Sequence, residues 1–479
     1  MRRGRSSQPS GSLSRQAQFP TASSRAADKT PGFALVACLF LIHAALGFVP
    51  KGSLLALGYA LGVLVVALVV AVWRRETHWA LYAAAYFAGA EVFWRMSRAG
   101  VFYEFGKYAI CLLLLVGLLR QGRTRLPAAP VTYFCLLVPA ALATLLSFEW
   151  STSRSLVSQN LSGPFVLLVC ALYCHRIIIR RPQVITTMIA LVLPLTTVAM
   201  YAARGVASSY IDWRKASNFD ASGGFGPNQV SAMLGLGALA ALIIIVLSRP
   251  LWLRIFSGGL LLWFLSQAAL TFSRTGIYLV GLSSVALGVF LLRDRRTRMR
   301  FLLGAIFAGL LATFVIYPAL DSMTDNKLSQ RFSEAKLSGR SEIASTDIEI
   351  WKSHWLLGTG VGQAKFGRAD FGFENTAAHT EYTRLLAEHG LLGLTALFLL
   401  VGFVGLNFLR QQKTGRAFAA GILVWALAFM MVSAMRLAIP AFLVGLSFAR
   451  LKLENDSRSP ARRRIAVPAT ARLFAPAGG

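Results

Sequence analysis

The sequence predicts an all-α polytopic membrane protein with about 12–14 transmembrane helices, and two observations carry this prediction. Hydrophobic residues make up 56% of the 479 residues and charged residues only 14%, whereas a soluble domain carries about 25% charged residues. In addition, apolar runs of roughly 20 residues recur along the chain, and each is long enough to cross a bilayer as a helix. The chain therefore reads as one helical membrane domain with polar tails.

Fourteen apolar segments have the composition of membrane spans. In order, they are 33–49, 53–73, 78–94, 104–119, 129–148, 164–180, 184–201, 227–247, 255–272, 276–292, 301–319, 386–409, 417–434 and 437–450. Arginine and lysine gather at alternate junctions, near 74, 120, 180, 250, 295 and 413. Short cytoplasmic loops carry such a positive bias, so both termini and all these junctions are expected in the cytoplasm.

Charge and cysteine usage narrow the possible partners. The net charge is +29, but its concentration at the junctions indicates a lipid bilayer rather than nucleic acid as the partner. The five cysteines all lie within apolar runs (Cys38, Cys111, Cys135, Cys170 and Cys174). Neither a disulfide framework nor a thiolate metal site is expected from this placement.

Polar segments divide the chain into five parts. Residues 1–32 and 451–479 are expected to be basic cytoplasmic tails, the first of them disordered. Transmembrane helices are expected over 33–319 and 386–450. Between them, 320–385 is too long for a simple connector, and we expect a small, mostly helical domain on the outer face. The sequence has no P-loop, dinucleotide fingerprint or zinc spacing that would indicate nucleotide-driven transport.

Two arginines are candidates for anion binding. Arg274 lies at an outer junction, against the positive-inside trend, where it either snorkels to lipid headgroups or binds a phosphate. Ser273 and Gly276 beside it permit a tight turn and favour the phosphate-binding interpretation. Arg340 begins a predicted helix of the outer segment, and a solvated surface charge is the alternative there.

His379 is the candidate base. It lies where the outer segment meets the next membrane span, beside Glu381. Lone histidines are usually structural, but histidine is also the side chain best suited to take a proton near neutral pH. One helical turn further on, Tyr382 and Thr383 are expected to reach the same side. Glu381 and Arg384 are expected to form a supporting polar face.

The ordered set of these motifs resembles the O-antigen ligase and O-antigen polymerase superfamily over roughly 270–395. One position departs from the family pattern, since Thr380 follows the histidine where the family often has asparagine. The set consists of Ser-Arg274-Thr-Gly, Ser-Gly-Arg340, Trp351, Gly358-x-Gly-x-Gly362, His379-x-x-Tyr382 and Glu388-x-Gly390-x-x-Gly393.

The resemblance implies a GT-C-like glycosyltransferase of the bacterial inner membrane. Such enzymes move a glycan from undecaprenyl diphosphate to a hydroxyl of an acceptor glycan or lipid A-core, on the periplasmic face, without a metal or other cofactor. The segment 320–385 is then the periplasmic catalytic loop. By the same resemblance, Arg274 and Arg340 bind the donor diphosphate and His379 is the catalytic base. Its supporting residues are Glu381, Tyr382, Arg384 and Glu388.

Two alternatives stay open at this level. A ligase and a polymerase need the same arginines and histidine, so residues alone do not separate them. A flippase or transporter for lipid-linked oligosaccharides is the alternative from another class. It predicts polar residues lining a path at mid-membrane, whereas Glu91, the clear acid within a predicted span, lies near the end of its span 78–94.

Overall fold

The computed structural model describes residues 31–74, 78–122, 126–208, 211–214, 217–292, 295–333, 340–374 and 376–453. Most of this part is helical, which confirms the predicted all-α fold. The first half contains α2 (Phe33–Leu46), α3 (Leu54–Trp73), α4 (His78–Met96), α5 (Phe105–Gln121), α6 (Ala128–Cys135), α7 (Val138–Ser147), α8 (Trp150–Cys174), α9 (Arg181–Ser208) and α10 (Pro227–Leu247).

The second half follows the same pattern, with shorter helices in its middle. It contains α11 (Leu251–Leu270), α12 (Thr275–Leu291), α13 (Arg295–Leu311), the π-helix η1 (Ala312–Ile316), α14 (Tyr317–Met323), α15 (Lys327–Ser333), α16 (Arg340–Ser353), α17 (Ala364–Gly367), the 3₁₀ helix η2 (Arg368–Phe371), α18 (Glu381–Leu409), α19 (Lys413–Ser433) and α20 (Ala438–Leu446). Two short strands, β1 (Ile178–Arg180) and β2 (Arg450–Lys452), pair in parallel.

Nine helical segments within the described ranges are long and apolar enough to cross a membrane, so the chain is a multi-pass membrane protein. They are Leu54–Trp73, Ala128–Ser147, Trp150–Cys174, Arg181–Ala207, Pro227–Leu247, Leu251–Leu270, Phe301–Met323, Glu381–Leu409 and Lys413–Ser433. Phe33–Leu46 and Thr275–Leu291 are apolar but shorter. Several boundaries differ from the prediction: α8 begins at Trp150 rather than at 164, α18 begins at Glu381 rather than at 386, and α20 has only 9 residues. The predicted span 129–148 is divided into α6 and α7.

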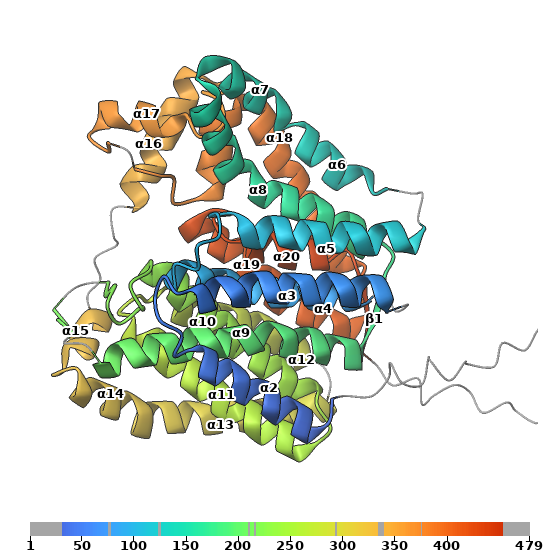
Figure 1. Cartoon of the computed structure of the whole chain (residues 1–479), viewed down its shortest axis with the longest axis vertical. Coiled ribbons are helices and arrows are strands. Elements are labelled where there is room, and N and C mark those ends of the chain that lie inside the picture. The colour runs from blue at the N-terminus through green and yellow to red at the C-terminus, as the bar shows by residue number, and fades with distance from the viewer. Residues whose placement is uncertain are drawn as a thin grey trace, which may run out of the picture.

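The two ends of the helix bundle differ in character (Figure 1). We call one end the basic end. There β1 pairs with β2, and Arg120 donates to the carbonyl of Arg74 over 2.7 Å. There Arg181 Nε also donates to the carbonyl of Leu247 over 2.6 Å. We call the opposite end the cap end, and α15, α16 and α17 lie beyond it. Four of the predicted cytoplasmic junctions therefore meet at the basic end.

The core lies around α10, most of which is buried against α9, α11 and α12. Small residues let α10 and α12 approach closely. A Cβ on Gly276 would stand 1.9 Å from the carbonyl oxygen of Ser231, and one on Gly235 would stand 2.4 Å from the carbonyl oxygen of Gly276. Gly276 therefore serves helix packing. The packing fixes the start of α12, directly after Arg274.

A kink in α18 joins the cap to the membrane bundle. Gly390 has φ 58° and ψ −133°, which interrupts the helix and frees its backbone groups. The Thr359 N–H donates to the Ala387 carbonyl over 2.9 Å, and the Leu391 N–H donates to the Leu356 carbonyl over 3.1 Å. A Cβ on Gly358 would stand 2.4 Å from the backbone of Glu388. The turn that contains Gly358, Gly360 and Gly362 therefore packs directly against the kink.

Candidate functional site

The turn before α12 presents Arg274 at the cap end. Ser273 Oγ donates to Asn228 Oδ1 over 2.7 Å, and Ser231 Oγ donates to the Ser273 carbonyl over 2.8 Å. Both bonds fix the turn to α10. Its left-handed residue is Phe272, with φ 56°, and not the flanking Gly276. The expectation that Gly276 permits the tight turn is therefore wrong, because this glycine is needed for the contact between α10 and α12.

Three arginines from separate elements gather beside this turn. Arg331 of α15 donates from Nε to the carbonyl of Phe272 over 3.3 Å, which seats α15 against the turn. Arg340 is the first residue of α16 and is half-buried. Burial lowers the pKa of Arg340, and the charges of Arg274 and Arg331 lower it further. The structure thus brings Arg274 and Arg340 together and adds Arg331 to them.

An apolar cavity of about 290 Å³ adjoins this arginine cluster. Leu328 and Phe332 of α15 line it, on the same helix that carries Arg331. The rest of its wall comes from the bundle and from a peripheral span, Phe301–Met323, of which no residue is buried. Those further lining residues are Leu262, Leu265, Ser266, Ala269, Ile277, Ala312, Ile316, Tyr317 and Leu320. A lipid chain can therefore lie directly beside a cationic site.

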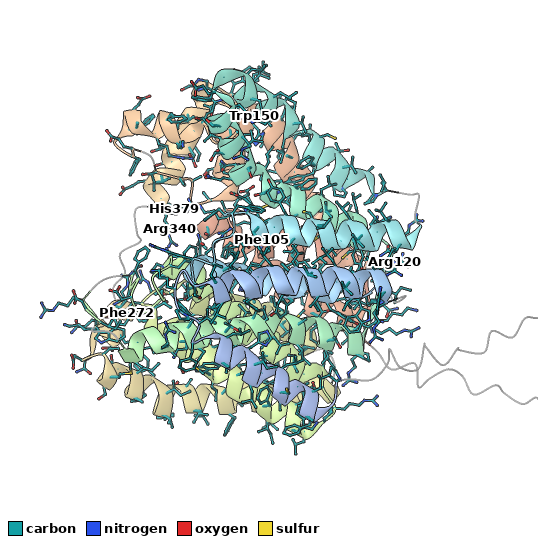
Figure 2. All side chains as sticks on the ribbon, viewed as in Figure 1. Phe105, Arg120, Trp150, Phe272, Arg340 and His379 are labelled. Atoms are coloured by element: carbon teal, nitrogen blue, oxygen red, sulfur yellow. The ribbon has the colours of Figure 1, made fainter. Side chains whose placement is uncertain are left out.

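His379 immediately precedes Thr380, the residue that caps α18. Thr380 Oγ1 accepts the Tyr382 N–H over 3.2 Å, so the start of the helix is fixed. The His379 carbonyl accepts the Ala434 N–H over 3.1 Å, and its half-buried imidazole has no hydrogen-bond partner among the described residues. Figure 2 shows His379 beside Arg340 at the cap end, with Arg120 at the basic end.

Burial and positive charge keep the imidazole of His379 neutral. Burial has the larger effect, and the charges of Arg436, Arg340 and Arg368 add to it, so that the pKa of His379 falls to about 4. At neutral pH its ring therefore carries a free lone pair that can accept a proton.

Arg436 belongs to the site but was missed by the sequence analysis. It lies in the turn between α19 and α20, and its Nη2 donates to the carbonyl of Ala378 over 2.6 Å. Burial lowers the pKa of Arg436, as do the charges of Arg368, Arg384 and Arg340. The signal was present in the sequence: Arg436 stands alone at an outer junction, as Arg274 does, against the positive-inside trend.

Three of the four predicted supporting residues form a buried ionic group within α18. Arg384 Nη2 lies 2.6 Å from Glu381 Oε1, and Arg384 Nη1 lies 2.7 Å from Glu388 Oε2. Glu381 Oε2 also accepts the Met435 N–H over 3.2 Å. Since buried charges are costly unless paired, this group fixes the first turns of α18 against the turn that carries Arg436.

Tyr382 and Thr383 do not reach the same side, contrary to expectation. Tyr382 Oη donates to the carbonyl of Leu427 on α19 over 3.0 Å, whereas Thr383 Oγ1 donates to Asp347 Oδ2 on α16 over 2.7 Å. Asp347 also pairs with Arg368 over 2.6 Å. Tyr382 and Thr383 thus anchor α18 to α19 and α16, respectively.

Within the described ranges, no three His, Cys, Asp or Glu side chains lie close enough together to hold a metal ion.

Most of the candidate site lies within a segment that matches a known protein family. Residues 259–398 match the family model described as O-antigen ligase, and the match includes Arg274, Arg340 and His379. Arg436 lies beyond the matched residues. No curated protein matches the chain.

Proposed function

We propose, on the premise that this chain belongs to the O-antigen ligase superfamily, that it moves a glycan from undecaprenyl diphosphate to a hydroxyl acceptor. The observation that carries this proposal is a half-buried histidine, His379, beside Arg340 and beside Arg436, whose Nη2 donates to the carbonyl of the preceding Ala378. A transferase that uses a lipid diphosphate donor needs both kinds of group, since one takes a proton and the other holds an anion.

The donor has two chemically different parts, and the cap end offers a place for each. The diphosphate would bind Arg274, Arg331 and Arg340, since guanidinium groups suit phosphate oxygens bidentately. The isoprenoid chain would lie in the adjacent apolar cavity, which is lined by Leu328 and Phe332 of the α15 helix that carries Arg331. This arrangement supports a lipid-linked donor.

In the proposed reaction, the acceptor hydroxyl gives its proton to the imidazole of His379 as its oxygen attacks the anomeric carbon. A new C–O bond forms there while the bond from that carbon to the diphosphate oxygen breaks, and the electron pair stays on the diphosphate. The leaving group gains negative charge during this step. Fixed arginines beside it stabilise that charge without reorganising.

Donor binding would also strengthen the base. In the free protein, burial and the arginine charges hold the pKa of His379 at about 4. A bound diphosphate offsets those positive charges, and a nearby anion favours the protonated form of histidine. The pKa of His379 would therefore rise towards its ordinary value when the donor is present. Proton transfer would then be most favourable only in the loaded enzyme.

The location of the site supports a periplasmic reaction at the inner membrane. The site lies at the cap end, opposite the basic end that carries Arg120 and Arg181. Basic junctions face the cytoplasm in short-looped membrane proteins. We therefore place the cap and His379 on the periplasmic face.

The glycan profile of a deletion strain tests this proposal and separates its variants. A ligase leaves the surface acceptor bare while lipid-linked polymer accumulates in the periplasm. A polymerase instead leaves single repeats attached to the acceptor. Accumulation of the lipid-linked glycan on the cytoplasmic face would support a flippase and contradict a transferase.

The diphosphate site has its own test. Arg274→Lys keeps the charge but loses the planar fork of donors. We expect transfer to fall about tenfold or more at normal membrane abundance, in line with the loss of one charged hydrogen bond. Wild-type transfer by Arg274→Ala would remove this arginine from the mechanism.

A further inference from the structure

A second cavity, of about 380 Å³, opens where α4 ends and α5 begins. It lies at the cap end, where Figure 2 labels Phe105 close to His379 and Arg340. No residue of the arginine cluster lines it, nor does His379. Its wall consists of Glu91, Trp94, Arg95, Arg98, Ala99, Gly100, Val101, Phe102, Tyr103, Phe105, Gly106 and Phe225.

Aromatic rings dominate this wall, and its charge is positive. Five of the lining residues are aromatic (Trp94, Phe102, Tyr103, Phe105 and Phe225). Glu91 is the one acid in the wall, and it already pairs with Arg95 and accepts the Ala438 N–H over 2.7 Å. Arg98 is exposed, and no acidic partner is found for it among the described residues. The uncompensated charge of the wall is therefore that of Arg98.

Two buried donors in this wall have no partner in the described part of the chain. They are Nε of Arg95, whose side chain is 6% exposed, and Nε1 of Trp94, which is 3% exposed. Buried N–H groups are almost always hydrogen-bonded. Aromatic surfaces with a few placed polar groups are the usual composition of a small-molecule site. The aromatic side chains of the wall can therefore pack against a sugar ring, and its positive charge can bind an anionic substituent on that ring.

Hydrogen bonds connect this cavity to His379. Arg95 Nη1 and Nη2 each donate to the carbonyl of Arg436 over 3.3 Å. Arg436 in turn donates to the carbonyl of Ala378, the residue before His379. The guanidinium of Arg95 also lies over the ring of Tyr103, 3.8 Å from its centroid. The cavity wall and the backbone of the candidate base are therefore parts of one connected structure.

The cavity and the arginine cluster are built from different elements. Arg274 and Arg331 lie at the turn of Phe272, whereas the cavity lies where α4 ends and α5 begins, and Figure 2 labels Phe272 and Phe105 at separate places of the cap end. In a displacement at an anomeric carbon, the nucleophile approaches from the side away from the leaving group. A diphosphate held at the turn of Phe272 therefore needs a separate site for the acceptor, and the cavity at the junction of α4 and α5 is such a site.

We infer that this cavity binds the acceptor, through a sugar residue that carries a carboxylate or a phosphate. The inference rests on the proposed transferase function. Arg98 binds the anionic substituent, the aromatic wall packs against the ring, and the acceptor hydroxyl extends from there towards His379. The cavity then selects which glycan is extended, while the arginine cluster and His379 act on any lipid-linked donor.

Equilibrium dialysis of the purified full chain with radiolabelled glucuronic acid tests the site directly. Arg98→Gln keeps a side chain of similar length at a residue with φ 50°, and should weaken glucuronate binding about tenfold. Glucose, which lacks the carboxylate, should bind to the wild-type chain at least as weakly as glucuronate binds to Arg98→Gln. The matched control is Arg154→Gln, because Arg154 is also exposed but lies on α8 outside the cavity. It should bind glucuronate as the wild type does.

A third variant separates the two cationic regions. If glucuronate binds in this cavity, Arg340→Gln leaves its affinity unchanged. Binding that weakens with Arg340→Gln and not with Arg98→Gln would place the ligand in the arginine cluster and overturn the inference. Absence of any glucuronate binding, and of glucose 6-phosphate binding in the same assay, would overturn it as well.

A transfer assay shows whether the ligand of this cavity is the acceptor. With the glycolipid extracted from a deletion strain as acceptor, Arg98→Gln should raise the acceptor KM about tenfold. The donor KM and kcat should be unchanged. An effect of Arg98→Gln on the donor KM alone would contradict the acceptor role while leaving the transferase function in place. If the wild-type chain transfers no glycan, the proposed function fails, and dialysis still decides whether the cavity binds an anionic sugar.

Discussion

Arg436 Nη2 donates a hydrogen bond of 2.6 Å to the carbonyl of Ala378, the residue before His379. The next carbonyl, that of His379 itself, accepts the Ala434 N–H over 3.1 Å. The carbonyls of Ala378 and His379 are thus both hydrogen-bonded to the turn between α19 and α20, although that turn is distant in the sequence. The candidate base therefore takes its position from this turn as well as from the start of α18.

Replacement of Arg436 should impair both donor binding and catalysis. Arg436→Gln removes a positive charge beside His379 and weakens the bond to Ala378, so we expect kcat/KM to fall about tenfold to a hundredfold. Steady-state transfer kinetics with a lipid-linked glycan measure the change. Arg154→Gln, on the exposed surface of α8, is the control and should retain wild-type kinetics. Unaltered kinetics in Arg436→Gln would exclude this arginine from the site.

The pH profile of transfer should report the unusual environment of His379. A base must be neutral to accept a proton, so activity persists above its pKa and is lost below it. Since burial and three arginines lower the pKa of His379 from 6.5 to about 4, the acid limb of kcat/KM should lie near pH 4.

Two shifts of that limb follow from the same charges. Donor-saturated kcat should lose activity at a higher pH than kcat/KM, because bound diphosphate raises the pKa of His379. Arg436→Gln removes one depressing charge and should move the limb of kcat/KM upwards. A limb near pH 6.5 that Arg436→Gln does not move would show that the arginines leave the base unperturbed.

Gly390→Ala should destabilise the protein strongly. The φ of 58° and ψ of −133° at Gly390 are strained for a residue with a side chain, and a Cβ there would stand 2.6 Å from the Gly358 amide nitrogen. Such a backbone conformation alone costs on the order of 1–3 kcal/mol. A clear drop in thermal stability is expected, measured by loss of monodisperse protein on heating. Gly402→Ala in the same helix meets nothing within 4 Å, and its melting temperature should stay at the wild-type value.

Topology reporters should place the two ends of the bundle in different compartments. A fusion at Lys413 should report the cytoplasm because this residue lies among basic junction residues. One at Asp325 should report the periplasm, since Asp325 lies between α14 and the cap helix α15. If both fusions report the same side, the orientation derived from charge is wrong.

Hydropathy predicted most of the apolar helices, but the predicted spans 78–94, 104–119 and 437–450 are not among the long apolar helices of the described residues. It also misplaced the start of α18. The predicted start at 386 omits Glu381 and Arg384, because a charged residue does not look like membrane sequence. In the structure these charges neutralise one another over 2.6 Å and are buried. The same limitation applies to α8, which begins at Trp150 with polar residues and continues into its apolar part. Hydropathy detects contact with lipid, and it does not detect a helix that pairs its own charges.

The site was only partly visible in the sequence. Arg274, Arg340 and His379 lie within one ordered set of motifs, so local signals were sufficient to propose them as site residues. Arg436 and Arg95 contact segments distant in the chain, as in the bond from Arg436 to Ala378. Those contacts exist only once α19, α20 and α4 pack together. Apart from the lone charge of Arg436 at an outer junction, no local pattern indicates these contacts.

Single-turnover transfer by His379→Ala tests the central claim most directly. Donor binding is measured first with the purified variant and a lipid-linked glycan, and transfer per folded molecule is measured afterwards. We predict that His379→Ala binds the donor as tightly as the wild type and transfers glycan about 10²–10⁴-fold more slowly, the usual cost of removing a general base. Arg340→Ala, as the companion variant, should instead lose donor affinity. Transfer by His379→Ala within about tenfold of the wild-type rate, at equal donor occupancy, would contradict a base at this position.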